Sequence, residues 1–132
     1  MNIHHIGYAV KSIEKSKHEF LNMGYREEGS ITHDDIREID ILFLVNGEYR
    51  IELVEPSSEN APIYNTLKKM GNTPYHICYC CENIEEQVEI LEQQGYLTTS
   101  EILPAVAISG RKVCFLYKRN VGVIELVEGL EA

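Results

Sequence analysis

Basic residues are scarce in this chain of 132 residues. Twelve Lys and Arg residues stand against 21 Asp and Glu residues, which gives a formal net charge of −9 at pH 7. A protein that binds nucleic acid needs a basic stripe to contact the phosphates. The composition therefore excludes nucleic acid as the main partner, although a local cluster of Arg and Lys could still bind a small anionic ligand.

Long apolar runs and leader-like segments are lacking as well. No stretch approaches the roughly 20 apolar residues that span a bilayer. The first residues, MNIHH, do not have the basic and then apolar order of a signal peptide. We expect a cytoplasmic protein with no membrane partner, and the length suits one compact domain with a core of its own.

Cysteines are few and poorly placed for disulfides. Three of the four, Cys78, Cys80 and Cys81, lie within four residues of a segment that has the composition of a strand. Neighbouring strand positions point to opposite faces, so these side chains cannot readily bridge one another. We expect free thiols in a reducing compartment.

The chain contains an internal duplication. The tetrapeptide His5-Ile6-Gly7-Tyr8 returns as His76-Ile77-Cys78-Tyr79, a shift of 71 residues (76 minus 5). The pentapeptide Ile51-Glu52-Leu53-Val54-Glu55 returns unchanged as Ile124-Glu125-Leu126-Val127-Glu128, a shift of 73 (124 minus 51). Each half therefore opens with a His and closes with a Glu, both on predicted strands.

Each half has the pattern of a β-α-β-β-β module. The predicted strands are residues 3–10, 25–31, 39–45 and 49–54, then 75–81, 96–103, 112–117 and 121–127. The predicted helices begin at the N-caps Ser12 and Asn83 and end at Gly24 and Gly95. We expect one domain, residues 1–132, with module one at 1–55, a linker with a short helix near 61–70 at 56–74, and module two at 75–132.

The alternation of strand side chains places both His residues away from the helices. Each His shares its face with two small residues: Gly7 and Ala9 beside His5, Cys78 and Cys80 beside His76. Small neighbours on a sheet leave space for a ligand. Since Gly7 and Ala9 cannot bind a metal through their side chains, we interpret the two cysteines as walls of this space and not as ligands.

The retention of two His and two Glu residues favours a metal site. A single strand Glu would more commonly lie on a solvated face, and a single strand His would more commonly be structural. Both copies keep both residue types while most other positions have drifted. We therefore predict that His5, Glu52, His76 and Glu125 bind one divalent metal. Imidazole and carboxylate ligands suit Ni²⁺ or Co²⁺ first, and also Zn²⁺ or Mn²⁺.

The segments HIGYAV at the start, YHIC in the middle and VIELVE at the end resemble the vicinal oxygen chelate superfamily. The resemblance covers essentially the whole chain. It implies an α+β fold in which two tandem βαβββ modules form a curved, U-shaped mixed sheet around a metal cavity, with the helices on the outer face. It implies the same four residues, His5, Glu52, His76 and Glu125, as metal ligands.

Among the activities of that superfamily, we expect a glyoxalase I, also called lactoylglutathione lyase. Such an enzyme converts the hemithioacetal of methylglyoxal and glutathione to S-lactoylglutathione through a metal-bound enediolate. The resemblance then implies Glu125 as the principal base and ligand, and Glu52 as its pseudo-symmetric partner. We also expect a small anionic substrate and a homodimer.

Three alternatives stay open. Methylmalonyl-CoA epimerase is favoured by the length and by the phrase Gly110-Arg111-Lys112-Val113, but the acidic stretch Asp34 to Ile39 departs from the epimerase pattern for the second base. A non-catalytic binding or resistance protein of the same fold is disfavoured by the complete ligand set. An extradiol dioxygenase, with two His and one carboxylate on iron, would leave one Glu unexplained.

Overall fold

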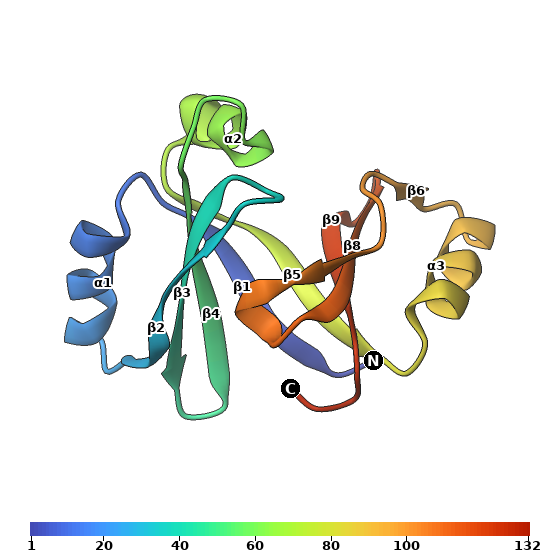
Figure 1. The fold of residues 1–132 in the computed structure, drawn as a ribbon, viewed down its shortest axis with the longest axis horizontal. Helices are drawn as coiled ribbons and strands as arrows, with labels where there is room; N and C mark the ends of the chain where they lie inside the picture. The colour runs from blue at the N-terminus through green and yellow to red at the C-terminus, as the bar shows by residue number, and fades with distance from the viewer. The chain divides into compact units, whose positions relative to one another are not determined.

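The computed structural model describes residues 1–132 and has an α+β fold (Figure 1). It contains nine strands, three α-helices and one short 3₁₀ helix. The chain forms two compact units, one of residues Ile6–Tyr75 and one of Met1–His5 together with His76–Ala132. The expected α+β class with two β-α-β-β-β modules is confirmed. No helix is long and apolar enough to cross a membrane.

The unit Ile6–Tyr75 contains most of the first module and the segment after it. Its elements, in chain order, are β1 (Ile3–Ala9), α1 (Ile13–Asn22), β2 (Arg26–Asp34), β3 (Ile39–Asn46), β4 (Tyr49–Pro56) and α2 (Pro62–Met70). The strands lie in the order β2-β3-β4-β1. β1 runs parallel to β4 and the other pairs are antiparallel, so the strand arrangement is mixed.

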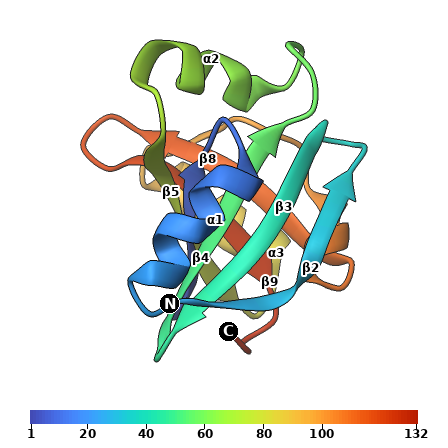
Figure 2. The same cartoon turned by 90° about the vertical axis from the view of Figure 1, so that its left-hand side faces the viewer.

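Helix α1 lies against one face of these strands (Figure 2). Ile6 and Tyr8 of β1 pack with Val10 and Ile13 in the hydrophobic core under the helix, as the alternation predicted. Ser12 caps the helix by accepting a hydrogen bond from the Lys15 amide. The helix α2 over 62–70 confirms the predicted short helix in the linker.

The other unit repeats the plan. Its elements are β5 (Thr73–Cys81), α3 (Ile84–Gln93), β6 (Leu97–Thr98), β7 (Leu103–Ala105), the 3₁₀ helix η1 (Val106–Ile108), β8 (Arg111–Lys118) and β9 (Gly122–Glu128). The strand order is β5-β9-β8-β6, with β7 also paired to β8, and β5 runs parallel to β9. The first residues of the chain join this unit, because the Cys80 amide donates to the Asn2 carbonyl at 2.8 Å.

The predicted single strand over 96–103 is wrong. Only Leu97–Thr98 and Leu103–Ala105 are strands, and both pair with β8. Between them, the Phe115 amide of β8 donates to the Ser100 hydroxyl at 2.9 Å, where a continuous strand would offer a carbonyl. Thr99 also binds the Phe115 carbonyl with both its amide and its hydroxyl. These side chains compete with the backbone ladder and interrupt the strand.

The second Glu of the repeated pentapeptide accepts a hydrogen bond from the first turn of the helix in each module. Glu55 Oε1 accepts a hydrogen bond from the Ile13 amide at 2.7 Å, and Glu128 Oε2 accepts one from the Ile84 amide at 3.1 Å. Both amides belong to the first turn of a helix, where the backbone lacks internal partners and the helix dipole favours a negative charge. The pentapeptide therefore ties the last strand of each module to its helix.

We expect Glu55→Ala to lower the free energy of unfolding by about 1–2 kcal/mol, since it leaves the Ile13 amide without its charged acceptor. Glu55→Gln keeps an acceptor oxygen and should lose about half as much. Urea titration followed by circular dichroism measures both changes, with Glu59→Ala on the exposed loop as the control. Equal stability of Glu55→Ala and the control would show that this contact does not stabilise the fold.

Candidate metal centre

The first and last strands of each module pair in parallel, and this pairing fixes the position of Glu52 in module one and of Glu125 in module two. In one unit, Glu125 of β9 lies opposite Cys78, two residues after His76, and opposite Phe115 on the other side. In the other unit, Glu52 of β4 lies opposite Gly7, two residues after His5, and opposite Phe43. The two modules thus place His and Glu in the same register.

Three of the four predicted ligands converge in the unit that contains β5 and β9. The Nε2 atoms of His5 and His76 are 3.2 Å apart, and each lies 3.1 Å from Oε1 of Glu125. All three residues are buried, with His5 only 1% exposed. The His76 ring also meets Phe115 edge to face, with the ring centroids 5.2 Å apart, which restricts its orientation.

Glu125 remains ionised despite its burial. Burial by itself raises the pKa of the Glu125 carboxyl. The adjacent imidazoles of His5 and His76 lower this pKa by more than burial raises it, so the net pKa falls below the ordinary value of 4.5. Its Oε1 atom is buried and has no well-aligned hydrogen bond, although two ring nitrogens lie close to it. A buried carboxylate oxygen in this position fits a bound cation.

The triangle of ligand atoms has the size that a divalent metal requires. Nε2 of His5, Nε2 of His76 and Oε1 of Glu125 lie 3.1–3.2 Å from one another, close enough for one divalent ion to contact all three. The donor set of two imidazole nitrogens and one carboxylate oxygen suits Zn²⁺, Co²⁺, Ni²⁺ or Mn²⁺.

The fourth predicted ligand, Glu52, belongs to the unit Ile6–Tyr75. It is 5% exposed, on a strand whose neighbouring residues Ile51, Leu53 and Val54 are also buried. A solvated face, the commoner position for a single strand Glu, does not describe Glu52, because residues 51–54 are all buried. Its role as a ligand stays a prediction that rests on the duplication.

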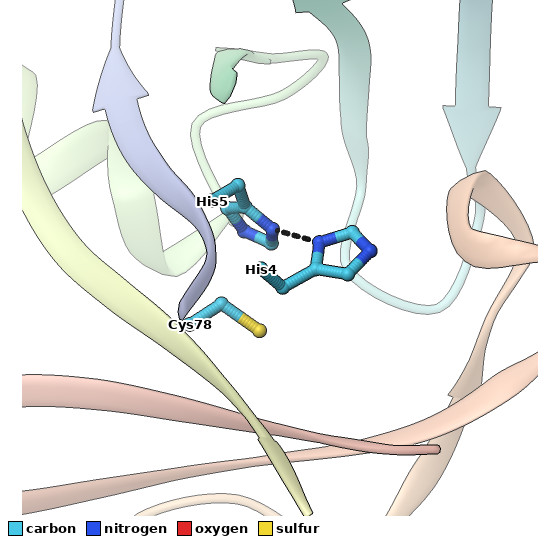
Figure 3. A group of neighbouring side chains, drawn as sticks. All are labelled: His4, His5 and Cys78. Carbon is cyan, nitrogen blue, oxygen red and sulfur yellow. Dashed lines mark hydrogen bonds between the residues drawn. The ribbon is translucent and has the colours of Figure 1, made fainter. Parts of the chain in front are cut away.

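The sequence reasoning missed one residue near these ligands. His4, which the sequence analysis does not single out, is only 7% exposed, and its Nδ1 lies 2.8 Å from Nδ1 of His5 (Figure 3). Cys78 lies close to both rings. The adjacent pair His4-His5 in the sequence was the available signal, but His4 has no repeated partner in the second half, where Tyr75 stands instead.

The acidic stretch before β3 serves a local structure. Asp34 is 2% exposed and binds Arg37 twice, through the guanidinium at 2.8 Å and through the backbone amide at 3.1 Å. Glu38 accepts a hydrogen bond from the Ser58 hydroxyl at 3.1 Å. These contacts stabilise the turn between β2 and β3, so Asp34 and Glu38 have a structural role there.

Known proteins of similar sequence include an epimerase. The chain is 25% identical over 119 residues to an ethylmalonyl-CoA/methylmalonyl-CoA epimerase of Cereibacter sphaeroides, with 89% of each chain covered. Among solved structures, it resembles a hypothetical protein of Bacillus halodurans at 30% identity and a TM-score of 0.87, covering 99% and 96% of the two chains. A methylmalonyl-CoA epimerase of Mycobacterium tuberculosis has the same fold, with a TM-score of 0.84 at 20% identity over 98% and 88% of the two chains.

The expectation of a glyoxalase I is wrong. The relatives and structural neighbours that carry the name of an activity are methylmalonyl-CoA epimerases, and they support the alternative in its place. The error has a physical reason. The ligand set and the fold are compatible with both reactions, so the residues that hold the metal do not distinguish between the substrates.

A family model matches residues 4–115, which include His5 and His76 and most of both modules. The match extends over more than half of the chain and agrees with the fold and with the duplicated register described above. The chain belongs to the Glyoxalase/Bleomycin resistance protein/Dioxygenase superfamily.

Proposed function

We propose that this protein is a metal-dependent epimerase that acts on methylmalonyl-CoA or a closely similar 2-alkylmalonyl-CoA. The observation that carries the proposal is the convergence of His5, His76 and Glu125 at 3.1–3.2 Å in a chain with named epimerase relatives. The proposed substrate is an anionic thioester, in agreement with the expected substrate class.

The chemical task is to remove and return one proton. The carbon between the thioester and the carboxylate of the substrate carries an acidic hydrogen, and its inversion requires proton removal on one face and delivery on the other. A divalent metal at this site would stabilise the negative charge on the substrate oxygens as a Lewis acid. Glu125, ionised and buried, is suited to accept the proton as a general base.

A second carboxylate is needed for the opposite face. We infer that Glu52 supplies it, since it occupies in module one the register that Glu125 occupies in module two. The same residue is the proposed fourth ligand, which would place a carboxylate of each module near the metal. Asp34 is a weaker candidate because Arg37 already holds its carboxylate.

We expect the purified protein, loaded with Co²⁺, to exchange the C2 hydrogen of methylmalonyl-CoA with deuterium in D₂O. Glu125→Gln keeps the shape of the side chain but cannot act as a base, so the rate should fall by about two orders of magnitude or more. Glu89→Gln, on the exposed face of α3, is the matched control. Mass spectrometry and proton NMR follow the exchange.

If Glu125→Gln exchanges the C2 hydrogen at the wild-type rate, Glu125 is not the base. No exchange by the wild-type protein with Co²⁺, Ni²⁺ or Zn²⁺ would reject methylmalonyl-CoA as the substrate.

We expect one divalent ion to bind per chain and to raise the melting temperature. His76→Ala removes one ligand. Loss of a residue that only supports a ligand weakens metal binding about 10–100-fold, so His76→Ala should weaken it by more than this. His18→Ala, an exposed residue of α1, serves as the control and should bind as the wild type does. Isothermal titration calorimetry with Zn²⁺ and Co²⁺ measures both affinity and stoichiometry, and unchanged affinity in His76→Ala would locate the metal elsewhere.

The homodimer stays a prediction. Static light scattering at micromolar concentration should give about twice the chain mass of 15.1 kDa. A species of the single-chain mass throughout the concentration range would refute it.

A further inference from the structure

A buried hydrogen bond joins the ligand His5 to its neighbour His4. The two Nδ1 atoms are 2.8 Å apart and the rings meet edge to face, with centroids 5.1 Å apart. Figure 3 shows the Nδ1 side of the His5 ring directed toward His4. A contact this short between two ring nitrogens requires one to carry a proton and the other to accept it.

The direction of this bond follows from the other side of the His5 ring. Its Nε2 faces His76 and Glu125, where the metal would bind. A neutral imidazole has one N–H and one lone pair, and a metal binds the lone pair. With a metal bound at Nε2, His5 would therefore carry its proton on Nδ1 and donate it to Nδ1 of His4. His4 in turn would carry its own proton on Nε2.

Cys78 could make this group a second metal site, because its thiol lies near both rings. Such a site would need the lone pair of His5 Nδ1. His5 would then have to bind metal through both nitrogens and lose its remaining proton, which is costly for a buried imidazole without a second cation already in place. The hydrogen bond of 2.8 Å requires no such change, so the geometry favours a supporting role for His4.

We propose that His4 is a positioning residue that fixes the tautomer and ring orientation of His5, and so presents Nε2 of His5 to the metal. The inference rests on the metal site of the proposed function. Metal-binding His residues commonly donate their second N–H to a carboxylate, a carbonyl or water, and this support raises metal affinity. Here a neighbouring imidazole is the acceptor.

The two halves of the protein differ at this point. Tyr75 precedes His76 where His4 precedes His5, so the second module does not repeat the imidazole acceptor. A change at His4 should therefore act directly on His5 and reach the His76 ring only through His5. This asymmetry separates a specific effect on one ligand from a general loss of structure.

The first test is the binding mode of His5 in the Zn²⁺-bound wild-type protein, read from ¹⁵N NMR of histidine-labelled material. We expect Nε2 to bind the metal and Nδ1 to carry a hydrogen-bonded proton. Metal bound through Nδ1 of His5 would overturn the proposal without any variant. In His4→Phe, the Nδ1 signal of His5 should lose the shift of a hydrogen-bonded N–H, while the Nδ1 signal of His76 should change much less.

The second test is the affinity for Zn²⁺ without substrate. His4→Phe should bind about 10–100-fold more weakly than the wild type. His4→Asn keeps an acceptor oxygen near the position of Nδ1 and should recover most of the affinity. Equal binding by the wild type and His4→Phe, or equal loss in both variants, would overturn the proposal.

These tests are independent of the epimerase activity. If Zn²⁺ binds with the expected order of affinities but methylmalonyl-CoA is not exchanged, the proposed substrate fails and the role of His4 stands. If the wild-type protein binds no metal, the role of His4 is overturned together with the site. Circular dichroism of each variant, with His18→Phe as the control, verifies the fold.

Discussion

The parallel pairing of the first and last strands of each module is the constraint on which the site depends. It places Glu125 opposite the residue that follows His76 by two positions, so the two side chains emerge on the same face. The β1–β4 pair does the same for Glu52. A slip of one residue would turn each Glu to the helix-covered face, and the ionised carboxylate would then lie in the hydrophobic core. The register is therefore specified by the cost of burying charge.

The repeated pentapeptide serves structure and chemistry at once. In the second copy the first Glu, Glu125, lies beside His5 and His76, and in both copies the second Glu, three positions later, accepts a hydrogen bond from the first amide of the helix. The apolar residues between them fill the core, as Leu53 and Leu126 are fully buried. The second Glu and the apolar residues therefore have the same structural roles in both copies, which limits divergence of the pentapeptide.

Much of the fold and part of the site were predictable from the sequence, because periodicity and repetition report burial directly. The helices with their caps at Ser12 and Asn83 were predicted correctly, as were His5, His76 and Glu125 as neighbours. The broken strand near Ser100 was not, since hydroxyl groups bonded to the backbone leave no periodic signal. The hydrogen bond between His4 and His5 was also missed. Strand alternation assigns adjacent residues to opposite faces, but two imidazole rings can still turn toward each other at the edge of the strand.

The activity could not be predicted because the metal ligands describe only the part of the reaction that related enzymes share. Two imidazoles and a carboxylate can hold a Lewis acid for any substrate that becomes negatively charged next to a carbonyl. The distinction between substrates depends on the groups that bind the rest of the molecule. Several basic residues that could do so already have structural partners, since Arg111 binds the backbone carbonyls of Glu128 and Gly129, and Lys112 binds Glu85. The metal ligands carry no information about which groups would bind the rest of a substrate, so a ligand set alone does not identify the reaction.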